Sequence, residues 1–222
     1  MNKTRTKIKA FTLIELLVVI SIIALLMSVM MPALSKARGM AKKTVCTSNV
    51  RQVMIAETIY TQEYDGWITP FTDSFTNNGF MTKLAVYNIP IEAFFCPSQT
   101  AAEQKTLKSG LGDYWNNYGL NMELAGMINA DGTRPVNQYH GKKLAAVKDA
   151  ANVIMLCDIE RDRVSKLANW GFCYAAAGQA FANRYSVRDY GGANYGFGDG
   201  RVEFIKDWES LNNEKHLKVY GR

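Results

Sequence analysis

The first sixty residues combine two hydrophobic patterns. Residues 11–31 form an apolar run in which Glu15 is the only charged residue. After Pro32, residues recur at alternating four- and three-residue spacing, at Cys46, Val50, Val53, Glu57 and Tyr60. This spacing predicts one long helix, with an apolar half over 11–32 and an amphipathic half over 33–62. Pro32 is expected to kink this helix without ending it, because helical signals resume directly afterwards.

The rest of the chain carries strand and turn patterns. A short apolar run at 153–159 predicts a strand, and 81–87 predicts a short helix. Residues 195–197 and 201–205 flank Gly198-Asp199-Gly200, which predicts an antiparallel hairpin. A further strand is expected near 217–220. These elements predict an α+β fold in which the long helix packs on an antiparallel sheet, within a globular domain over 63–222.

The apolar run is long enough to cross a membrane, since about 20 apolar residues suffice. The segment before it, 1–10, has four basic residues and no acidic one. Positive charge next to a membrane span stays on the cytoplasmic side. We therefore expect a single pass of the inner membrane, a cytoplasmic N-terminus, and a globular domain in the periplasm or outside the cell. A lone ionisable group within such a span is costly to bury, which favours a function for Glu15 over a tolerated charge in an ordinary signal anchor.

The segment Lys9-Ala10-Phe11-Thr12-Leu13-Ile14-Glu15-Leu16 resembles the processing site of type IV prepilins and type II secretion pseudopilins. The resemblance implies that 1–10 is a leader, removed by prepilin peptidase between Ala10 and Phe11, and that Phe11 is then methylated. It also implies that Glu15 is an assembly carboxylate, facing the new amine of a neighbouring subunit. The family usually has Gly before the cut, whereas this chain has Ala10, the next smallest residue. The implied partners are the peptidase, other pilin-like subunits and an inner-membrane assembly platform.

Later segments resemble one prepilin subfamily, which is named for a His, nine residues and then Asp-Gly. The shared segments are 46–52, 64–66, 95–98, 118–121 and the closing hairpin at 191–204. Asp199-Gly200 supplies the Asp-Gly, but Asp189 stands where the subfamily has the His. The resemblance implies the pilin-like form of the α+β fold, with the helix as its spine. Some pseudopilins bind calcium in a C-terminal loop, so Asp189 and Asp199 are the only metal candidates we retain.

The charge balance does not indicate a nucleic-acid partner. The chain has a net charge of +6, but without the four basic residues of 1–10 it has 22 Lys and Arg against 20 Asp and Glu. Nucleic-acid binding needs a clustered basic patch, which this balance does not favour. We expect a membrane partner and no nucleic acid.

All four cysteines fall in the part expected to be exported, where disulfides persist. Four cysteines allow three pairings. We favour Cys46 with Cys96, which would tie the helix to the domain, and Cys157 with Cys173. Buried free thiols remain the alternative.

No catalytic signature is present, since the two His residues, His140 and His216, have no metal-binding or catalytic spacing. We therefore expect a structural subunit with no enzymatic activity and no cofactor. It would form a type II secretion pseudopilus or a type IV pilus-like fibre that supports protein secretion, or be a minor or tip subunit that binds cargo or glycan. The alternative from another class is a signal-anchored extracellular carbohydrate-binding module or enzyme.

Overall fold

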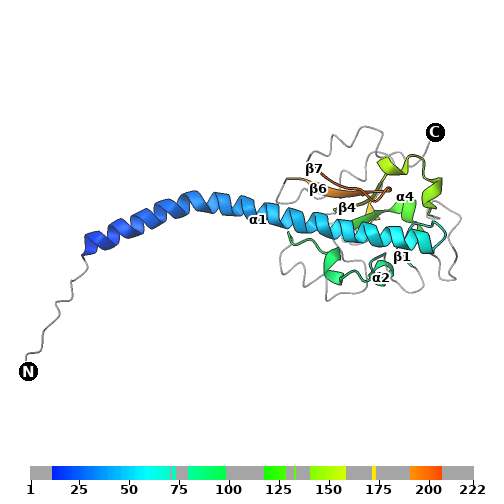
Figure 1. The fold of residues 1–222 in the computed structure, drawn as a ribbon, viewed down its shortest axis with the longest axis horizontal. Coiled ribbons are helices and arrows are strands. Elements are labelled where there is room, and N and C mark those ends of the chain that lie inside the picture. The colour runs from blue at the N-terminus through cyan, green and yellow to red at the C-terminus, as the bar shows by residue number, and fades with distance from the viewer. Residues whose placement is uncertain are drawn as a thin grey trace, which may run out of the picture. The chain divides into compact units, whose positions relative to one another are not determined.

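The computed structural model describes residues 12–70, 72–73, 80–98, 118–128, 133, 141–158, 172–173 and 191–206. The chain divides into two compact units, Met1–Met40 and Ala41–Arg222. Helix α1, Leu13–Glu63, runs through the boundary between them (Figure 1). Pro32 lies inside α1 and the helix continues past it, although the kink expected there stays a prediction.

The second half of α1 packs on the globular unit through the predicted face. All five residues of the 4-3-4-3 series are buried, with Met54, Ala56 and Thr61 beside them. The helix lies so close to the sheet that a Cβ on Gly196 would come within 2.5 Å of Met54 Sδ. Thr47 Oγ1 also donates to Asn194 Oδ1 at 2.6 Å. This part of α1 is therefore the central element of the globular unit.

The main sheet has five strands in the order β5-β2-β4-β6-β7. Their bounds are Tyr118–Asn121 for β2, Ile154–Asp158 for β4, Phe172–Cys173 for β5, Ala193–Phe197 for β6 and Val202–Ile205 for β7. Four strands, β2-β4-β6-β7, are antiparallel, and the short β5 adds to β2 in parallel. The α+β fold with a long helix on an antiparallel sheet is confirmed, and β5 is a parallel addition at its edge.

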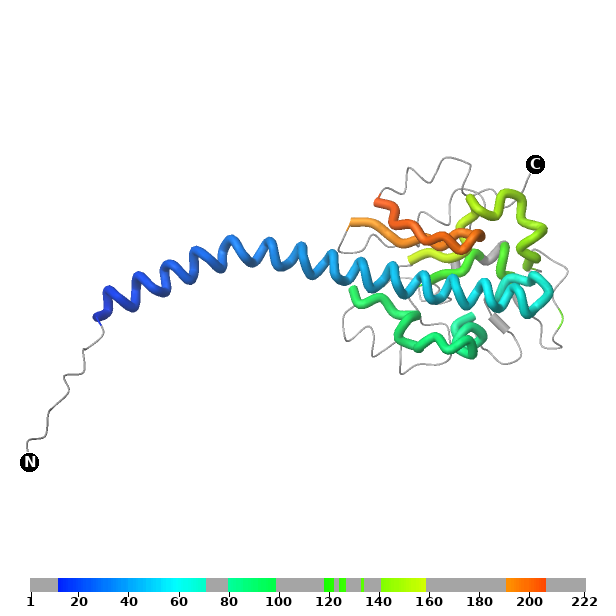
Figure 2. Tube along the Cα trace, viewed as in Figure 1, coloured from blue at the N-terminus to red at the C-terminus, as the bar shows by residue number. Residues whose placement is uncertain are grey.

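The predicted hairpin is β6-β7, which pairs from Ala193 with Ile205 to Gly196 with Val202. In Figure 2 these two strands, orange to red, lie beside the later part of α1. The predicted 153–159 strand is β4, and the predicted short helix is α2, Phe80–Ala85. The strand expected near 217–220 lies outside the described residues.

The remaining elements are short. They are β1 Thr72–Asp73 and β3 Met127–Ile128, which pair in parallel, the helix α4 Met122–Ala125, and the 3₁₀ turns η1 Ile91–Phe94, η2 Leu144–Ala146 and η3 Ala150–Asn152. The core of the globular unit draws side chains from α1, α2, the 91–96 segment and the inner strands, including Phe80, Phe94, Tyr118, Leu156 and Tyr195.

Cys46 and Cys96 form a disulfide with Cα atoms 5.5 Å apart, which links α1 to the segment after η1. The suggested pair of Cys157 with Cys173 is contradicted by the strand register. Cys157 is opposite Gly119 of β2, while Cys173 is opposite Asn121 on the other side of β2. Strands two places apart are separated by roughly 9–10 Å, beyond the Cα separation of about 7 Å that a disulfide can bridge. The spacing of these cysteines along the chain carried no information about this register.

Candidate functional site

The first turn of α1 is closed by hydrogen bonds between Thr12 and Glu15. The Thr12 backbone N–H and hydroxyl both donate to Glu15 Oε2 at 2.9 Å. In return, the Glu15 N–H donates to Thr12 Oγ1 at 3.2 Å. Thr12 is the residue before the helix and Glu15 is its third residue, so the arrangement is a reciprocal capping box. The carboxylate of Glu15 is thus bound within its own chain.

Thr12 is a site residue that the sequence-based prediction does not include. The signal for it is present, since a Ser or Thr followed three residues later by an acid before an apolar run marks a helix start. The cost of burying Glu15 in a membrane indicates that it needs a partner, but this cost alone does not identify a partner within the same helix turn. Glu15 has two properties at once: it caps the helix, and it is the one charge in the apolar run.

The apolar residues of α1 that follow the capping box, as far as Met31, are not covered by other described parts of the protein. Leu13 is 86% exposed, and the apolar residues that follow to Met31 remain largely exposed. Within α1, an 18-residue window reaches a mean hydropathy of 2.8 with none of it buried. Among the described residues α1 is the one helix long and apolar enough to cross a membrane. Such a surface is compatible with a membrane anchor, because lipid can cover it.

The other predicted processing residues, Ala10 and Phe11, lie outside the described residues. Glu15 is therefore the only one of the three whose contacts the structure gives. The proposed cut and the methylation of Phe11 stay predictions.

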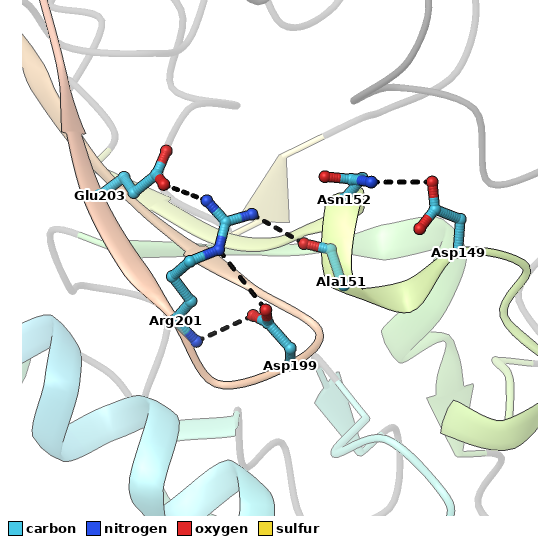
Figure 3. Close-up of polar contacts among 6 residues, drawn as sticks. All are labelled: Asp149, Ala151, Asn152, Asp199, Arg201 and Glu203. Carbon is cyan, nitrogen blue, oxygen red and sulfur yellow. Dashed lines mark hydrogen bonds and ion pairs between the residues drawn. The ribbon is translucent and has the colours of Figure 1, made fainter.

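The carboxylate of Asp199, one of the two calcium candidates, is engaged by Arg201 (Figure 3). Its Oδ1 accepts from the Arg201 backbone N–H at 3.0 Å, and its Oδ2 lies 3.5 Å from Arg201 Nε. The same guanidinium pairs with Glu203, donates to the Ala151 carbonyl at 2.8 Å, and lies 4.0 Å from the Phe197 ring centre. This cluster joins the tip of the β6-β7 hairpin to η3.

A calcium ion at Asp199 would have to displace the guanidinium of Arg201 from Oδ2. Asp189, the other candidate, lies outside the described residues. In the part of the chain that the structure describes, no three His, Cys, Asp or Glu side chains gather closely enough to hold a metal ion. The contacts that are present join two turns, because Arg201 binds both Asp199 at the hairpin tip and the Ala151 carbonyl of η3, and we call this arrangement a structural joint.

Comparison with known proteins adds one match. The prokaryotic N-terminal methylation motif matches residues 5–31, which include most of the basic segment, the capping box and the apolar run. No curated protein and no solved structure matches the chain. The match ends before Pro32, so it bears on the N-terminal segment alone.

The matched motif supports a type IV prepilin-like protein, and the fold is consistent with one. The motif lies on a long apolar helix, which continues into an α+β globular unit. The motif indicates a pilin-type structural subunit more than an enzyme, and it implies processing by prepilin peptidase and assembly with other pilins.

Proposed function

We propose that this chain is a fibre subunit, assembled into a type II secretion pseudopilus or a type IV pilus-like fibre that supports protein secretion. The observation that carries the proposal is the position of Glu15. It is the only charge in an apolar run of membrane length, it lies within the matched methylation motif, and it is fixed in the first turn of α1. A charge in that environment is retained when it has a functional partner.

The partner we propose is the amine of a neighbouring subunit. Cleavage between Ala10 and Phe11 would leave a methylated, cationic N-terminus one helical turn from Glu15. Both donors of Thr12 bind Oε2, so Oε1 can accept from a neighbour while the cap stays closed. In a medium of low dielectric constant such a pair is strongly attractive, and leaving either charge alone is heavily penalised. Subunits in the wrong register would leave a charge unpaired, so the pair would set the register of the fibre.

In this role the chain would be inserted into the inner membrane, processed there and then assembled. The leader would remain in the cytoplasm, the apolar half of α1 would cross the inner membrane, and the globular unit would lie beyond it. Prepilin peptidase would cleave and methylate the chain, and an inner-membrane platform would feed it into the fibre with other pilin-like subunits. The globular unit then has a mechanical role, with no chemistry of its own.

The first test is intact mass and N-terminal sequencing of the protein from native membranes. We expect a chain that begins at Phe11 and carries one extra methyl group. A chain that still begins at Met1, or that is cut after the apolar run, would contradict the proposal.

The second test compares two substitutions within the apolar run, Glu15→Val and Ser21→Val. Ser21→Val is the matched control, because it also replaces a polar side chain by valine but removes no charge. Glu15→Val should enter the membrane and yield no fibres, whereas Ser21→Val should assemble. Normal fibres from Glu15→Val would refute the charge pair.

A further inference from the structure

Helix α1 carries a second stripe of residues within the globular unit, away from its buried face. We call it the outer stripe, and its members are Val45, Ser48, Gln52, Ile55, Ile59 and Gln62. They recur at three- and four-residue spacing, so they lie along one side of the helix. Ile55 is 61% exposed, Val45 48% and Ile59 42%. These three exposed apolar side chains share one helix face with three polar ones, a mixture that is typical of an interaction site.

The outer stripe borders a groove of about 290 Å³. The groove is lined by Val45, Asn49 and Gln52 of α1, and by Pro90, Glu92 and Phe95 from the segment around η1, among others. Its second wall is fixed to the helix, because Asn49 Nδ2 donates to the Phe95 carbonyl at 3.1 Å and the Cys46–Cys96 disulfide follows directly. Ile91, in the same wall segment, is 48% exposed. The groove and the outer stripe thus form one preformed surface that mixes apolar and polar side chains.

The two flanks of this surface have opposite charge. Arg51 is exposed on one side of the outer stripe. Glu63, exposed on α1, lies about 120° from Arg51 around the helix, and the exposed Glu92 lines the groove on the η1 side. A surface with a basic flank and an acidic flank is complementary to a parallel copy of itself placed beside it. Such a contact is heterologous, because different flanks meet, and repeated contacts of that kind extend into rings or filaments.

We propose that the outer stripe and its groove are the contact of the globular unit with a second copy of this chain, in which Arg51 of one copy meets the acidic flank of the next. The inference rests on the proposed fibre function, which holds all copies parallel through their N-terminal helices. Anchoring in one membrane also raises the effective concentration of copies, so a modest surface suffices. The outer stripe supplies contact area, and the charged flanks fix the orientation of one copy against the next.

The test places a photo-crosslinking amino acid in the full-length chain, in membranes that carry its assembly machinery. One probe replaces Ile55 in the outer stripe, and the control replaces Glu203, which is also exposed but lies on β7. We expect covalent dimers from the Ile55 probe and several-fold fewer from the Glu203 probe. Equal or greater yield from Glu203 would overturn the proposal. The Cys46–Cys96 disulfide, followed on a non-reducing gel, checks that each variant has folded.

A charge exchange sharpens the test. Arg51→Glu and Glu92→Arg should each lower the yield of Ile55 dimers about tenfold or more, since like charges then face each other, and the double variant should recover it. A double variant with a dimer yield as low as that of either single variant would overturn the orientation we propose.

Mature N-termini and normal fibres without an Ile55 crosslink would refute this surface alone. Absence of processing and of fibres would instead refute the proposed function, and an Ile55 dimer in those membranes would still support the surface.

Discussion

Glu57 Oε1 accepts a hydrogen bond from the backbone N–H of Thr69 at 2.8 Å, and both residues are buried. The contact ties α1 to the chain shortly after the helix ends. Among the described residues, Glu57 Oε2 has no hydrogen-bond partner. Burial raises the pKa of Glu57 to about 7, although the Thr69 hydrogen bond acts in the opposite direction. The spine helix therefore carries a carboxyl group that is protonated in mild acid and becomes charged near neutrality.

The first prediction is a pH-dependent stability that originates at Glu57. The ordinary pKa of this carboxyl is 4.5 and its pKa in the folded chain is about 7, so the folded state binds the proton more tightly than the unfolded state does. The stabilisation is complete below about pH 4.5 and is lost as the pH rises to 7, by about 3 kcal/mol in all. Urea unfolding of the full chain in detergent, followed across this range, measures it.

Glu57→Gln removes the ionisable group and keeps an oxygen for Thr69. It should flatten the slope between pH 4.5 and 7 and leave this variant the more stable one above pH 7. Glu92→Gln changes an exposed carboxyl and should retain the wild-type slope. An unchanged slope in Glu57→Gln would mean that the pH dependence arises at other groups.

The spine and the hairpin could be predicted because their signals are local. Alternating four- and three-residue spacing marks the buried face of α1 whatever it packs against, and Asp199-Gly200 between apolar runs specifies a hairpin. Strand β2 has no such signal, since two of its four residues are Gly119 and Asn121. It forms because β4 and β5 pair with it on both sides, and Asn121 Nδ2 donates to the Ile154 carbonyl at 2.9 Å. Its existence depends on distant segments, as tertiary context overrides local propensity.

The candidate site could also be predicted only in part from the sequence. Glu15 could be predicted, because the cost of burying a charge in an apolar run can be judged from composition alone. The role of Asp199 could not be judged that way. Its carboxylate is engaged by Arg201, and the same guanidinium reaches the Ala151 carbonyl fifty residues earlier in the chain. Only the folded arrangement shows that a metal would compete with an arginine there.

A second prediction concerns the disulfide between α1 and the segment after η1. The bond joins residues 50 apart, and removing it should lower the free energy of unfolding by about 2–4 kcal/mol. Cys46→Ser and Cys96→Ser should each show this loss in denaturant unfolding. Because either change abolishes the same bond, the double variant should lose no more than a single one does. Losses that add would show that the cysteines stabilise the fold separately, by packing alone.

The capping box gives a third prediction. Thr12→Val keeps the shape of the side chain but removes the hydroxyl that donates to Glu15 Oε2 and accepts from the Glu15 N–H. Loss of such a cap costs about 1 kcal/mol, which corresponds to roughly fivefold faster amide exchange in the first turn. Hydrogen exchange at Glu15, measured by NMR on the full chain in micelles, should show this increase. Thr12→Ser retains the hydroxyl and should exchange at the wild-type rate; equal acceleration in both variants would contradict the cap.

The last prediction tests how closely the hairpin tip approaches η3. A Cβ on Gly198 would lie 2.5 Å from the carbonyl oxygen of Ala150, a backbone atom with little freedom to move. The Gly198 N–H also donates to the Val153 carbonyl at 3.0 Å, which holds the two segments at this distance. Gly198→Ala should therefore destabilise the globular unit by about 1–3 kcal/mol, measured as a lower unfolding midpoint. Gly39→Ala, where a Cβ meets nothing within 4 Å, should cause no loss. If Gly198→Ala unfolds at the wild-type midpoint, the hairpin tip and η3 are free to separate, and the Arg201 contacts with Ala151 do not fix the joint.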